Sequence, residues 1–255
     1  MKTMKSIYTT EEAIGLMRKA DRIAALSGAG ISTEAGVPDF RGPTGLWQDP
    51  ELIKQLSATG FREDPESFYR SSMNLFSTMA KAEPTMAHKL LVRLQNIGKL
   101  DTVVTQNIDG LHQKAGSSRV FEVHGTYRTG YCPQCGATFE MGPFYEDLES
   151  GRIKVPLCKS CSVPVKPDIV LFEELLPEEA WNGAVEAMEE CDLLLVLGSS
   201  LVIYPAAELP SIALINGARM IIVNLEATAY DSAATVVVRE KLGNFATSAL
   251  AAFTQ

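Results

Sequence analysis

The chain has 255 residues, which is enough for one large domain with its own core or for a large domain with a small insert. An apolar fraction of 46% and a charged fraction of 21% are typical of a globular protein and argue against extensive disorder. The net charge of −8 argues against a protein that coats nucleic acid, so we expect a basic partner and no direct nucleic-acid binding.

The distribution of apolar residues excludes two further classes of protein. No segment approaches the roughly 18–20 uninterrupted apolar residues that cross a bilayer, and the strongest apolar run, residues 193–197, has the length of a strand. Residues 1–10 contain two lysines with no apolar segment after them, unlike a secretory signal. We therefore expect a cytoplasmic protein that does not act at a membrane.

Helical and strand-like patterns alternate along most of the chain. Thr9 or Thr10 is placed to cap a first helix, and Pro65 stands in the first turn of a later one. The predicted helices cover residues 11–20, 64–81, 84–96, 109–115, 178–190, 206–215 and 244–253. The predicted strands cover residues 22–27, 100–105, 120–123, 165–171, 193–197, 220–224 and 235–238. This alternation predicts an α/β fold, a Rossmann-like parallel sheet with helices on both faces.

The segment 131–161 differs from its surroundings, with few aliphatic residues and a charged middle. It holds Cys132-x-x-Cys135 and Cys158-x-x-Cys161, separated by 22 residues, a spacing close to that of two zinc knuckles. Four thiolates complete a tetrahedron and leave no open position, so the pattern predicts one structural zinc ion. A redox dithiol is the alternative, against which the two matched pairs argue.

These patterns divide the chain into two predicted domains. The Rossmann-like domain is discontinuous and comprises residues 1–130 and 164–255. A small inserted zinc-binding domain, similar to a zinc ribbon, comprises residues 131–163, and part of a helical insert over residues 48–82 is expected to pack near it. The fifth cysteine, Cys191, is interpreted as a small buried apolar residue.

Loops after four predicted strands carry residues suited to binding a ligand. Gly28, Gln106, Gly198 and Asn224 each follow the end of a strand. Because parallel sheets bind ligands beyond the carboxyl ends of their strands, we expect these four loops to surround one site.

The first of these loops is rich in glycine. Gly28 and Gly30 would let the backbone approach a pyrophosphate closely, with free N–H groups facing the anion. Thr33 replaces the third glycine of the dinucleotide fingerprint, so a tight strand-to-helix turn is the alternative. Glu226, after a later strand, is placed to recognise a ribose or to cap a helix.

A second loop, residues 36–47, is rich in Gly and Pro yet carries Asp39, Phe40, Arg41 and Trp47. Surface loops seldom carry such residues unless they fold over something, so the loop is predicted to cover a cofactor. A packed structural loop is the alternative.

Two more segments point to the same edge of the sheet. Residues 105–110 place amides and a carboxylate at a strand end, where they suit a carboxamide or ribose ligand or form an Asx-rich turn capped by Asp109. His124 follows the strand 120–123, and a histidine there is suited to proton transfer near neutral pH. His88 and His112 lie on predicted helices and are expected to be structural.

Together these motifs resemble the sirtuin family of NAD-dependent protein-lysine deacylases, in its short prokaryotic type. The resemblance extends over residues 28–242 and rests on Gly28-Ala29-Gly30-Ile31-Ser32, Pro38-Asp39-Phe40-Arg41, Thr105-Gln106-Asn107-Ile108-Asp109, His124-Gly125, the four paired cysteines, Gly198-Ser199-Ser200 and Asn224-Leu225-Glu226. It implies a large Rossmann-like domain and a small zinc domain, with an acyl-lysine peptide in the cleft between them.

The resemblance also implies roles for single residues. The glycines and serines would hold phosphates or ribose, and residues 39–41 would cover the nicotinamide. Residues 106–109 would line the pocket of the nicotinamide ribose. Asn224, Glu226 and Leu242 would face the adenosine. The implied NAD-binding residues are Gly28, Ala29, Gly30, Ser32, Asp39, Phe40, Arg41, Trp47, Gln106, Asn107, Ile108, Asp109, Gly198, Ser199, Ser200, Asn224, Leu225, Glu226 and Leu242.

The implied reaction consumes NAD as a co-substrate. The acyl oxygen attacks the ribose carbon that carries nicotinamide, and nicotinamide leaves. His124 then serves as general base toward a ribose hydroxyl, with Asn107 as a second catalytic residue. The products are nicotinamide, free lysine and O-acetyl-ADP-ribose, and the partners are acyl-lysine proteins or peptides. We expect His124→Ala or His124→Tyr to abolish turnover while the zinc and the fold are kept.

By the same resemblance, the substrate peptide adds to the protein as a strand. The implied contacts are Val170, Phe172, Val202 and Tyr204. The family usually has Phe-Gly-Glu where this chain has a glutamate, Glu173, in place of the glycine. This departure adds negative charge to the peptide-contacting loop and is expected to stiffen it.

A second departure concerns the acyl group. Family members that remove succinyl or malonyl groups carry Tyr-x-x-Arg, whereas here Tyr69 is followed three positions later by Ser72. Without that guanidinium a carboxylate has no partner, so we expect deacetylation, with neutral longer acyl groups accepted and succinyl disfavoured.

Two other functions fit the same motifs. A mono-ADP-ribosyltransferase would use the cleft with a protein side chain as acceptor. A non-catalytic NAD-responsive binding protein would bind NAD without releasing nicotinamide, and intact His124, Asn107 and Asp109 argue against it.

Overall fold

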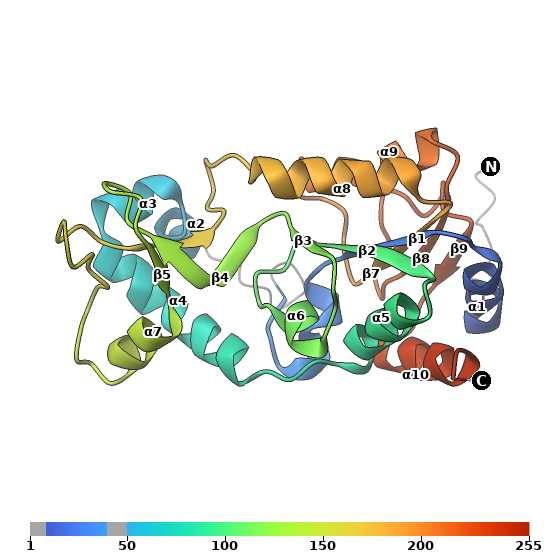
Figure 1. Cartoon of the computed structure of the whole chain (residues 1–255), viewed down its shortest axis with the longest axis horizontal. Helices are drawn as coiled ribbons and strands as arrows, with labels where there is room; N and C mark the ends of the chain where they lie inside the picture. Colours follow the sequence, from blue (N-terminus) through green and yellow to red (C-terminus); the bar gives the residue numbers. More distant parts are fainter. Residues whose placement is uncertain (1–8, 40–49, 255) are drawn as a thin grey trace.

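The computed structural model describes residues 9–39 and 50–254, and Figure 1 shows how its elements are arranged. Its α-helices are α1 (Thr10–Lys19), α2 (Pro50–Gln55), α3 (Ala58–Glu63), α4 (Pro65–Lys81), α5 (Met86–Asn96), α6 (Leu111–Ala115), α7 (Gly142–Glu149), α8 (Glu178–Glu190), α9 (Leu209–Ile215) and α10 (Leu242–Ala252). Its strands are β1 (Ile23–Ser27), β2 (Leu100–Thr105), β3 (Val120–Glu122), β4 (Gly125–Tyr131), β5 (Thr138–Glu140), β6 (Lys166–Ile169), β7 (Leu193–Leu197), β8 (Arg219–Val223) and β9 (Val236–Val238).

A six-stranded sheet runs in the order β3-β2-β1-β7-β8-β9, and all of its pairings are parallel. The predicted α/β class is therefore confirmed. The chain adds strands outward from β1 in one direction and from β7 in the other. The carboxyl ends of β1 and β7 thus flank the point where the strand order reverses, which is where such sheets bind ligands.

Helices cover both faces of this sheet. On β7, Leu193, Leu195 and Leu197 join one core with residues of α1, α5 and α10. Leu194 and Val196 join the opposite core with residues of α8 and α9. This alternation follows from the two-residue period of strand side chains, and Figure 1 shows the two sets of helices on opposite sides of the sheet.

A second, three-stranded sheet in the order β5-β4-β6 is antiparallel and lies toward the other end of the molecule (Figure 1). Aromatic residues of α4, among them Phe68, Tyr69 and Phe76, pack in the core beside it. The prediction for residues 165–171 placed this strand in the parallel alternation, but β6 pairs with β4 instead. It follows the second cysteine pair without a crossover helix, which a parallel neighbour would need.

Local signals explain several helix boundaries. The Oδ1 atom of Asp64 accepts a hydrogen bond from the N–H of Ser67 at 2.9 Å, and Pro65 opens α4 as predicted. The predicted helix over residues 206–215 is instead a short 3-10 turn followed by α9. None of the helices in the described ranges combines the length and the apolar character needed to span a membrane.

Candidate functional site

A cavity of about 710 Å³ lies at the carboxyl ends of β1, β2, β7 and β8 and extends toward the second sheet. All four strand-end loops singled out in the sequence contribute to it. The predicted residues that line it are Gly28, Ala29, Gly30, Asp39, Gln106, Asn107, Ile108, His124, Val170, Phe172, Gly198, Ser199, Ser200, Tyr204, Asn224, Leu225, Glu226 and Leu242.

The remaining predicted residues are placed differently. Ser32 and Asp109 are buried next to the cavity and are not part of its lining. Val202 is exposed and also stands outside the lining. Phe40, Arg41 and Trp47 fall outside the residues that the structure describes.

The glycines after β1 are required by the packing of two loops. A Cβ atom on Gly28 would lie 2.8 Å from the carbonyl oxygen of Gly198, and one on Gly30 would lie 2.7 Å from the Cα of Gly198. The N–H groups of Gly28 and Gly30 donate to the carbonyl oxygens of Leu197 and Gly198, at 3.0 and 2.9 Å. These two N–H groups are therefore used within the protein, in contrast to the expectation that they face an anion.

A buried polar cluster supports the loop after β2. The Ser32 hydroxyl donates to Asp109 Oδ2 at 2.6 Å, and Asn107 Nδ2 donates to the carbonyl oxygen of Gly28 at 3.2 Å. Burial raises the pKa of Asp109, although the hydrogen bond from Ser32 opposes the shift. Asn107 Nδ2 also lies 3.4 Å from Asp109 Oδ2, so Asp109 holds Asn107, which reaches the cavity, from behind the wall.

His124 stands where β3 ends, half-buried in the cavity wall. Its Nδ1 lies 2.9 Å from the carbonyl oxygen of Gln106. Since a carbonyl only accepts, Nδ1 carries the proton and Nε2 is left as an acceptor. Burial lowers the pKa of His124, and the bond to Gln106 partly opposes this. At neutral pH the ring is therefore uncharged and competent to take a proton.

The other two histidines form a buried pair under the large sheet. Their ring centroids are 4.7 Å apart. His112 Nε2 lies 2.8 Å from Ser27 Oγ, and His88 Nδ1 lies 2.9 Å from Thr85 Oγ1. Burial lowers the pKa of His88 to about 4, and it also lowers the pKa of His112 well below its usual value. Both lie in the core, as the sequence analysis expected.

One end of the cavity is polar and lies near β8 and the start of α10. Asn224 Nδ2 donates to the carbonyl oxygen of Glu226 at 2.9 Å, which shapes the loop after β8. Glu34 Oε1 accepts from the N–H of Gly243 at 3.2 Å and joins the first loop to α10. Glu34, Glu240 and Lys241 line this end, and no sequence signal indicated them, because the contact is made across the fold.

The other end of the cavity is largely apolar. It is lined by Leu56, Ser72, Leu75, Phe76 and Leu171. Ser72, Leu75 and Phe76 occur at helical spacing on α4. The periodicity of the predicted helix over residues 64–81 could therefore have indicated that they share one face.

Tyr69 does not reach this apolar end of the cavity. It is fully buried, and its hydroxyl donates to the carbonyl oxygen of Val165 at 2.5 Å. Burial raises the pKa of Tyr69, so its hydroxyl stays protonated and remains a donor. Ser72, one helical turn further along, is the residue of this pair that touches the cavity.

Two loops with exposed apolar side chains form the mouth of the cavity. Phe172 lies on one loop, and Val202 and Tyr204 lie on the other, with 38%, 45% and 70% of their surface exposed. The N–H of Val170 donates to the carbonyl oxygen of His124 at 2.8 Å, which ties the first loop to the half-buried histidine. Exposed apolar side chains around a cavity mouth are typical of a peptide-binding surface.

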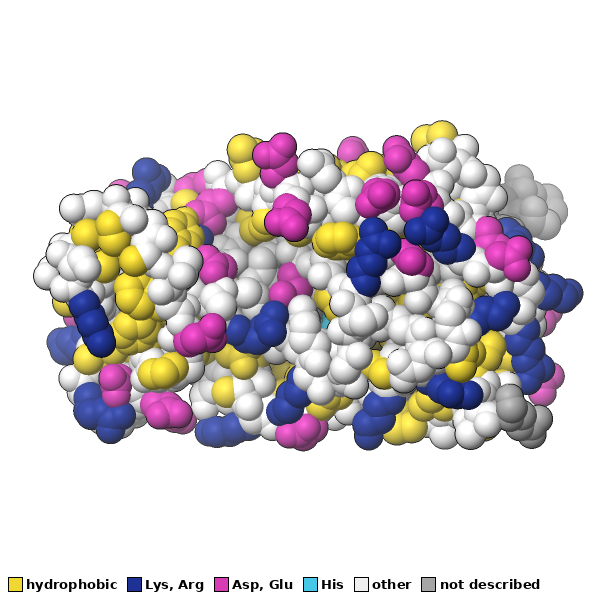
Figure 2. Space-filling model, viewed as in Figure 1, with side chains coloured by type: hydrophobic (Ala, Val, Ile, Leu, Met, Phe, Trp, Pro, Cys, Tyr) yellow, Lys and Arg dark blue, Asp and Glu magenta, His cyan; other side chains and the backbone are white. Residues whose placement is uncertain are grey.

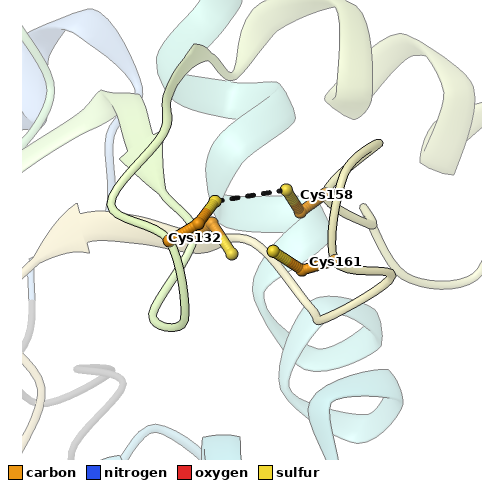
Figure 3. Close-up of side chains that lie close together, drawn as sticks. Cys132, Cys158 and Cys161 are labelled. Carbon is orange, nitrogen blue, oxygen red and sulfur yellow. Dashed lines mark hydrogen bonds between the residues drawn. The ribbon is translucent and has the colours of Figure 1, made fainter.

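The four paired cysteines lie together in the small sheet's part of the molecule. Their Sγ atoms are all within 4.8 Å of one another, and the labelled side chains in Figure 3 converge. The Sγ atoms of Cys135 and Cys158 are 3.8 Å apart. Two ligands on a tetrahedral zinc with Zn–S bonds of about 2.3 Å would be separated by about 3.8 Å. The geometry and the chemistry of this donor set therefore fit zinc.

The thiols of this cluster influence one another's ionisation. The pKa of Cys132 is lowered to about 7, mainly by the backbone N–H of Cys135. The pKa of Cys161 is raised to about 12, first through its hydrogen bond with Cys135 and also by repulsion from neighbouring thiolates. A divalent cation among the four would remove this repulsion.

Comparisons with known proteins agree with this geometry. The family model described as "Sir2 family" matches residues 28–205. The chain is similar to NAD-dependent protein deacylase 2 of Archaeoglobus fulgidus, with 44% identity over 91% of each chain. It is also similar to the NAD-dependent protein deacetylase of Thermotoga maritima, with 41% identity over 92% of this chain and 95% of that protein.

Solved structures are similar over almost the whole length. A structure of Sir2 with a deacetylated p53 peptide and 3′-O-acetyl ADP ribose has a TM-score of 0.90 and 38% identity, covering 96% of this chain and 98% of that chain. A structure described as Sir2, p53 peptide and NAD+ has a TM-score of 0.87 and 39% identity, with the same coverage. Sir2Tm bound to a propionylated peptide has a TM-score of 0.87 and 37% identity, again with that coverage.

Proposed function

Because this chain belongs to the Sir2 family, we propose that it is an NAD-dependent protein-lysine deacetylase. It converts an acetyl-lysine peptide and NAD into nicotinamide, free lysine and O-acetyl-ADP-ribose. The observation that carries this proposal is a single cavity that joins the strand-end loops to the exposed peptide-binding mouth, with an uncharged imidazole in its wall. An NAD site and an acyl-lysine site so joined bring both substrates within reach of His124.

The residues of the polar end are proposed to bind NAD. Ala29 and Ser199 lie on the two interlocked loops and are assigned to the phosphates. Gln106 Nε2 donates to Ser199 Oγ at 2.9 Å, so the loop after β2 positions the loop after β7. Asn224 and Glu226 are assigned to the adenosine, and Asn107 to the nicotinamide ribose.

His124 is proposed as the general base toward a ribose hydroxyl. The carbonyl of Gln106 holds the Nδ1–H tautomer, which leaves Nε2 free to accept the proton. A positioned base of this kind contributes about 10²–10⁴-fold to the rate.

The apolar end is proposed to bind the acyl chain. Leu56, Leu75 and Phe76 favour a neutral acyl group, and in the described lining of this end there is no guanidinium to pair with a carboxylate. We expect acetyl and butyryl peptides to be turned over at least tenfold faster, as kcat/KM, than a succinyl peptide of the same sequence. A succinyl peptide used as well as the acetyl peptide would contradict this acyl preference.

The four paired cysteines are proposed to hold one structural zinc ion. The sulfur separations support this assignment, and a site closed by four thiolates has no position for a substrate. The zinc would stabilise the small sheet and take no part in the chemistry.

The function is tested with an acetyl-lysine peptide, NAD and the purified chain. We expect nicotinamide release that depends on the acetyl group, together with O-acetyl-ADP-ribose detected by mass spectrometry. The same peptide without the acetyl group is the control. With NAD labelled on its adenine, label that stays on protein would indicate ADP-ribosyl transfer, and NAD binding without nicotinamide release would indicate a non-catalytic binding protein.

A further inference from the structure

The turn at the mouth of the cavity carries a glutamate where its backbone favours glycine. The N–H of Glu174 donates to the carbonyl oxygen of Leu171 at 3.1 Å and closes a four-residue turn. Glu173, its third residue, has a φ of +79°, in the left-handed region. Turns with this conformation at the third position usually have glycine or asparagine there. The sirtuin family usually has glycine at this position, so the glutamate here requires a separate physical explanation.

The side chain of Glu173 is hydrogen-bonded to Thr59, a residue distant in the sequence. Its Oε2 accepts hydrogen bonds from the N–H and the hydroxyl of Thr59, at 3.0 and 2.8 Å. Arg62 in turn donates to the Thr59 hydroxyl at 3.1 Å. The hydrogen bonds from Thr59, side chain first, lower the pKa of Glu173, so the carboxylate is ionised at neutral pH. Its negative charge is therefore held in one place.

That charge faces outward, in contrast to the charge beside it. Glu174 is paired with the buried Lys166 at 2.9 Å, and Lys166 also donates to the carbonyl oxygen of Ile169 at 2.8 Å. Glu173 is exposed, lines the cavity next to Phe172, and forms no ion pair within 4 Å among residues 9–39 and 50–254. Lys166 is thus already neutralised by Glu174. Arg62, which bonds to the same Thr59 hydroxyl, attracts the Glu173 carboxylate from beyond ion-pair distance, so the exposed carboxylate keeps a face open to a charge on the substrate.

The surroundings of the loop reinforce this negative charge. A second hollow lies on the other side of it, between β4 and the start of α8, and Figure 2 shows more acidic than basic side chains around the hollow in this view. Its lining includes Glu122, which is paired with Arg128, and Lys166, which is paired with Glu174. Asp168 and Glu179 also line it, and neither forms an ion pair within 4 Å among the described residues. A peptide approaching the turn therefore meets a negative field from more than one direction.

We propose that Glu173 is a specificity-determining residue, which favours acyl-lysine peptides that carry lysine or arginine next to the acyl-lysine. This inference rests on the proposed function, because it concerns the peptide bound at the same mouth. An exposed pair of opposite charges has a modest effect that salt weakens. We expect a preference of about two- to fivefold in kcat/KM, carried mainly by KM.

The test uses acetyl-lysine peptides that differ only in one flanking residue, which is lysine, glutamine or glutamate, on either side of the acetyl-lysine. Wild type is compared with Glu173→Gln, Glu173→Gly and the control Glu178→Gln, an exposed glutamate at the start of α8 outside the cavity. Glutamine keeps a side chain of the same size and an acceptor for Thr59, whereas glycine suits the turn. We expect wild type and Glu178→Gln to prefer the lysine peptide, and both Glu173 variants to lose that preference. The preference of wild type should also shrink between low and high salt.

Several outcomes would overturn the inference. These are equal use of the lysine and glutamine peptides by wild type, a preference that survives in Glu173→Gln, and a preference that Glu178→Gln also loses. If only Glu173→Gly lost the preference for the lysine peptide, the preference would depend on anchoring of the turn. That result would also overturn a role for the charge. Nicotinamide release with the glutamine peptide reports on the deacetylase activity separately, so its absence would count against the proposed function.

Discussion

The two sheets of this protein are stabilised by different means. In the six-stranded sheet, β1 and β7 are buried along their whole length, and apolar cores lie on both faces. In the three-stranded sheet, β5 is largely exposed and β4 mostly half-buried, and the core beside it includes two of the cysteines. We therefore expect the first sheet to be stabilised by apolar burial on both faces, and the second to need its cysteine cluster in addition to the core on one side.

This difference explains where the chemistry is located. The strand-end loops belong to the well-buried sheet, so they present binding groups from a rigid base. His124 lies at the junction, in the two-residue link between β3 and β4. The second sheet supplies the loop with Phe172, one side of the cavity mouth. Damage to the second sheet should therefore remove activity without unfolding the first.

The largest effect is expected from loss of the metal site. In Cys158→Ser one of four thiolates is missing, and structural zinc contributes on the order of 10 kcal/mol to the folding of small zinc units. We expect zinc content to fall far below one ion per chain, activity to disappear, and amide hydrogen-exchange protection to be lost in β4, β5 and β6 while β1, β7 and β8 keep theirs. Metal analysis and hydrogen exchange measure this.

Cys191→Ser is the matched control for that variant. Cys191 is buried in the core between the large sheet and α8 and is not one of the four clustered cysteines. Its replacement should lower the free energy of unfolding by about 1–2 kcal/mol, while zinc content and activity remain. Zinc retained in Cys158→Ser, or protection lost throughout the large sheet, would show that the two sheets are not stabilised separately.

A smaller effect is expected when the junction alone is altered. His124→Ala should reduce kcat/KM about 10²–10⁴-fold, or about 3–5 kcal/mol, with zinc content and thermal stability unchanged. Because burial lowers the pKa of His124, the midpoint of the fall in wild-type activity with decreasing pH should lie below 6.5, as the ring gains a proton. Steady-state kinetics between pH 5 and 8.5 measure both. A reduction of kcat/KM by less than tenfold in His124→Ala would contradict the role of His124 as general base.

The smallest effect concerns acid stability of the large sheet. His88 is buried and neutral, with a pKa lowered to about 4 from its usual 6.5. Its contribution is complete above pH 6.5 and is lost as the pH falls toward 4, because only the unfolded chain takes up the proton. The free energy of unfolding should decrease by about 2 kcal/mol by pH 5 and about 3 kcal/mol near pH 4 from this residue.

Replacing His88 by leucine isolates that contribution. His88→Leu should be less stable than wild type at pH 7.5 by about 1–3 kcal/mol, because the N–H of Thr85 loses its acceptor at 3.2 Å. It should, however, lose less stability between pH 7.5 and 5. Urea unfolding followed by circular dichroism at several pH values gives the two slopes, and equal slopes would contradict the assignment to this residue.

Much of the large sheet was predictable from the sequence because its signals are local. The apolar run over residues 193–197 coincides with β7, and Asp64 with Pro65 marks the start of α4. The small sheet was less predictable. β4 is mostly half-buried and carries Gly, Thr, Tyr and Arg, and β5 is short and largely exposed, so neither has the apolar pattern of a buried strand.

The candidate site divides in the same way. Gln106, Asn107 and His124 follow strands, so their place at the sheet edge could be inferred from chain order. Leu56 and Glu34 could not be found, because each reaches the cavity through contacts between distant parts of the chain.

By itself, the sequence determined the composition of the site: the paired cysteines, the strand-end glycines and amides, and a histidine after an apolar strand. Only the tertiary structure decided which of these touch the cavity, that Asp109 and Ser32 stand behind its wall, and that Glu173 bonds to Thr59, 114 residues away. The reason is physical: strand and turn signals arise from neighbours along the chain, whereas burial and hydrogen bonding between loops depend on how the elements pack.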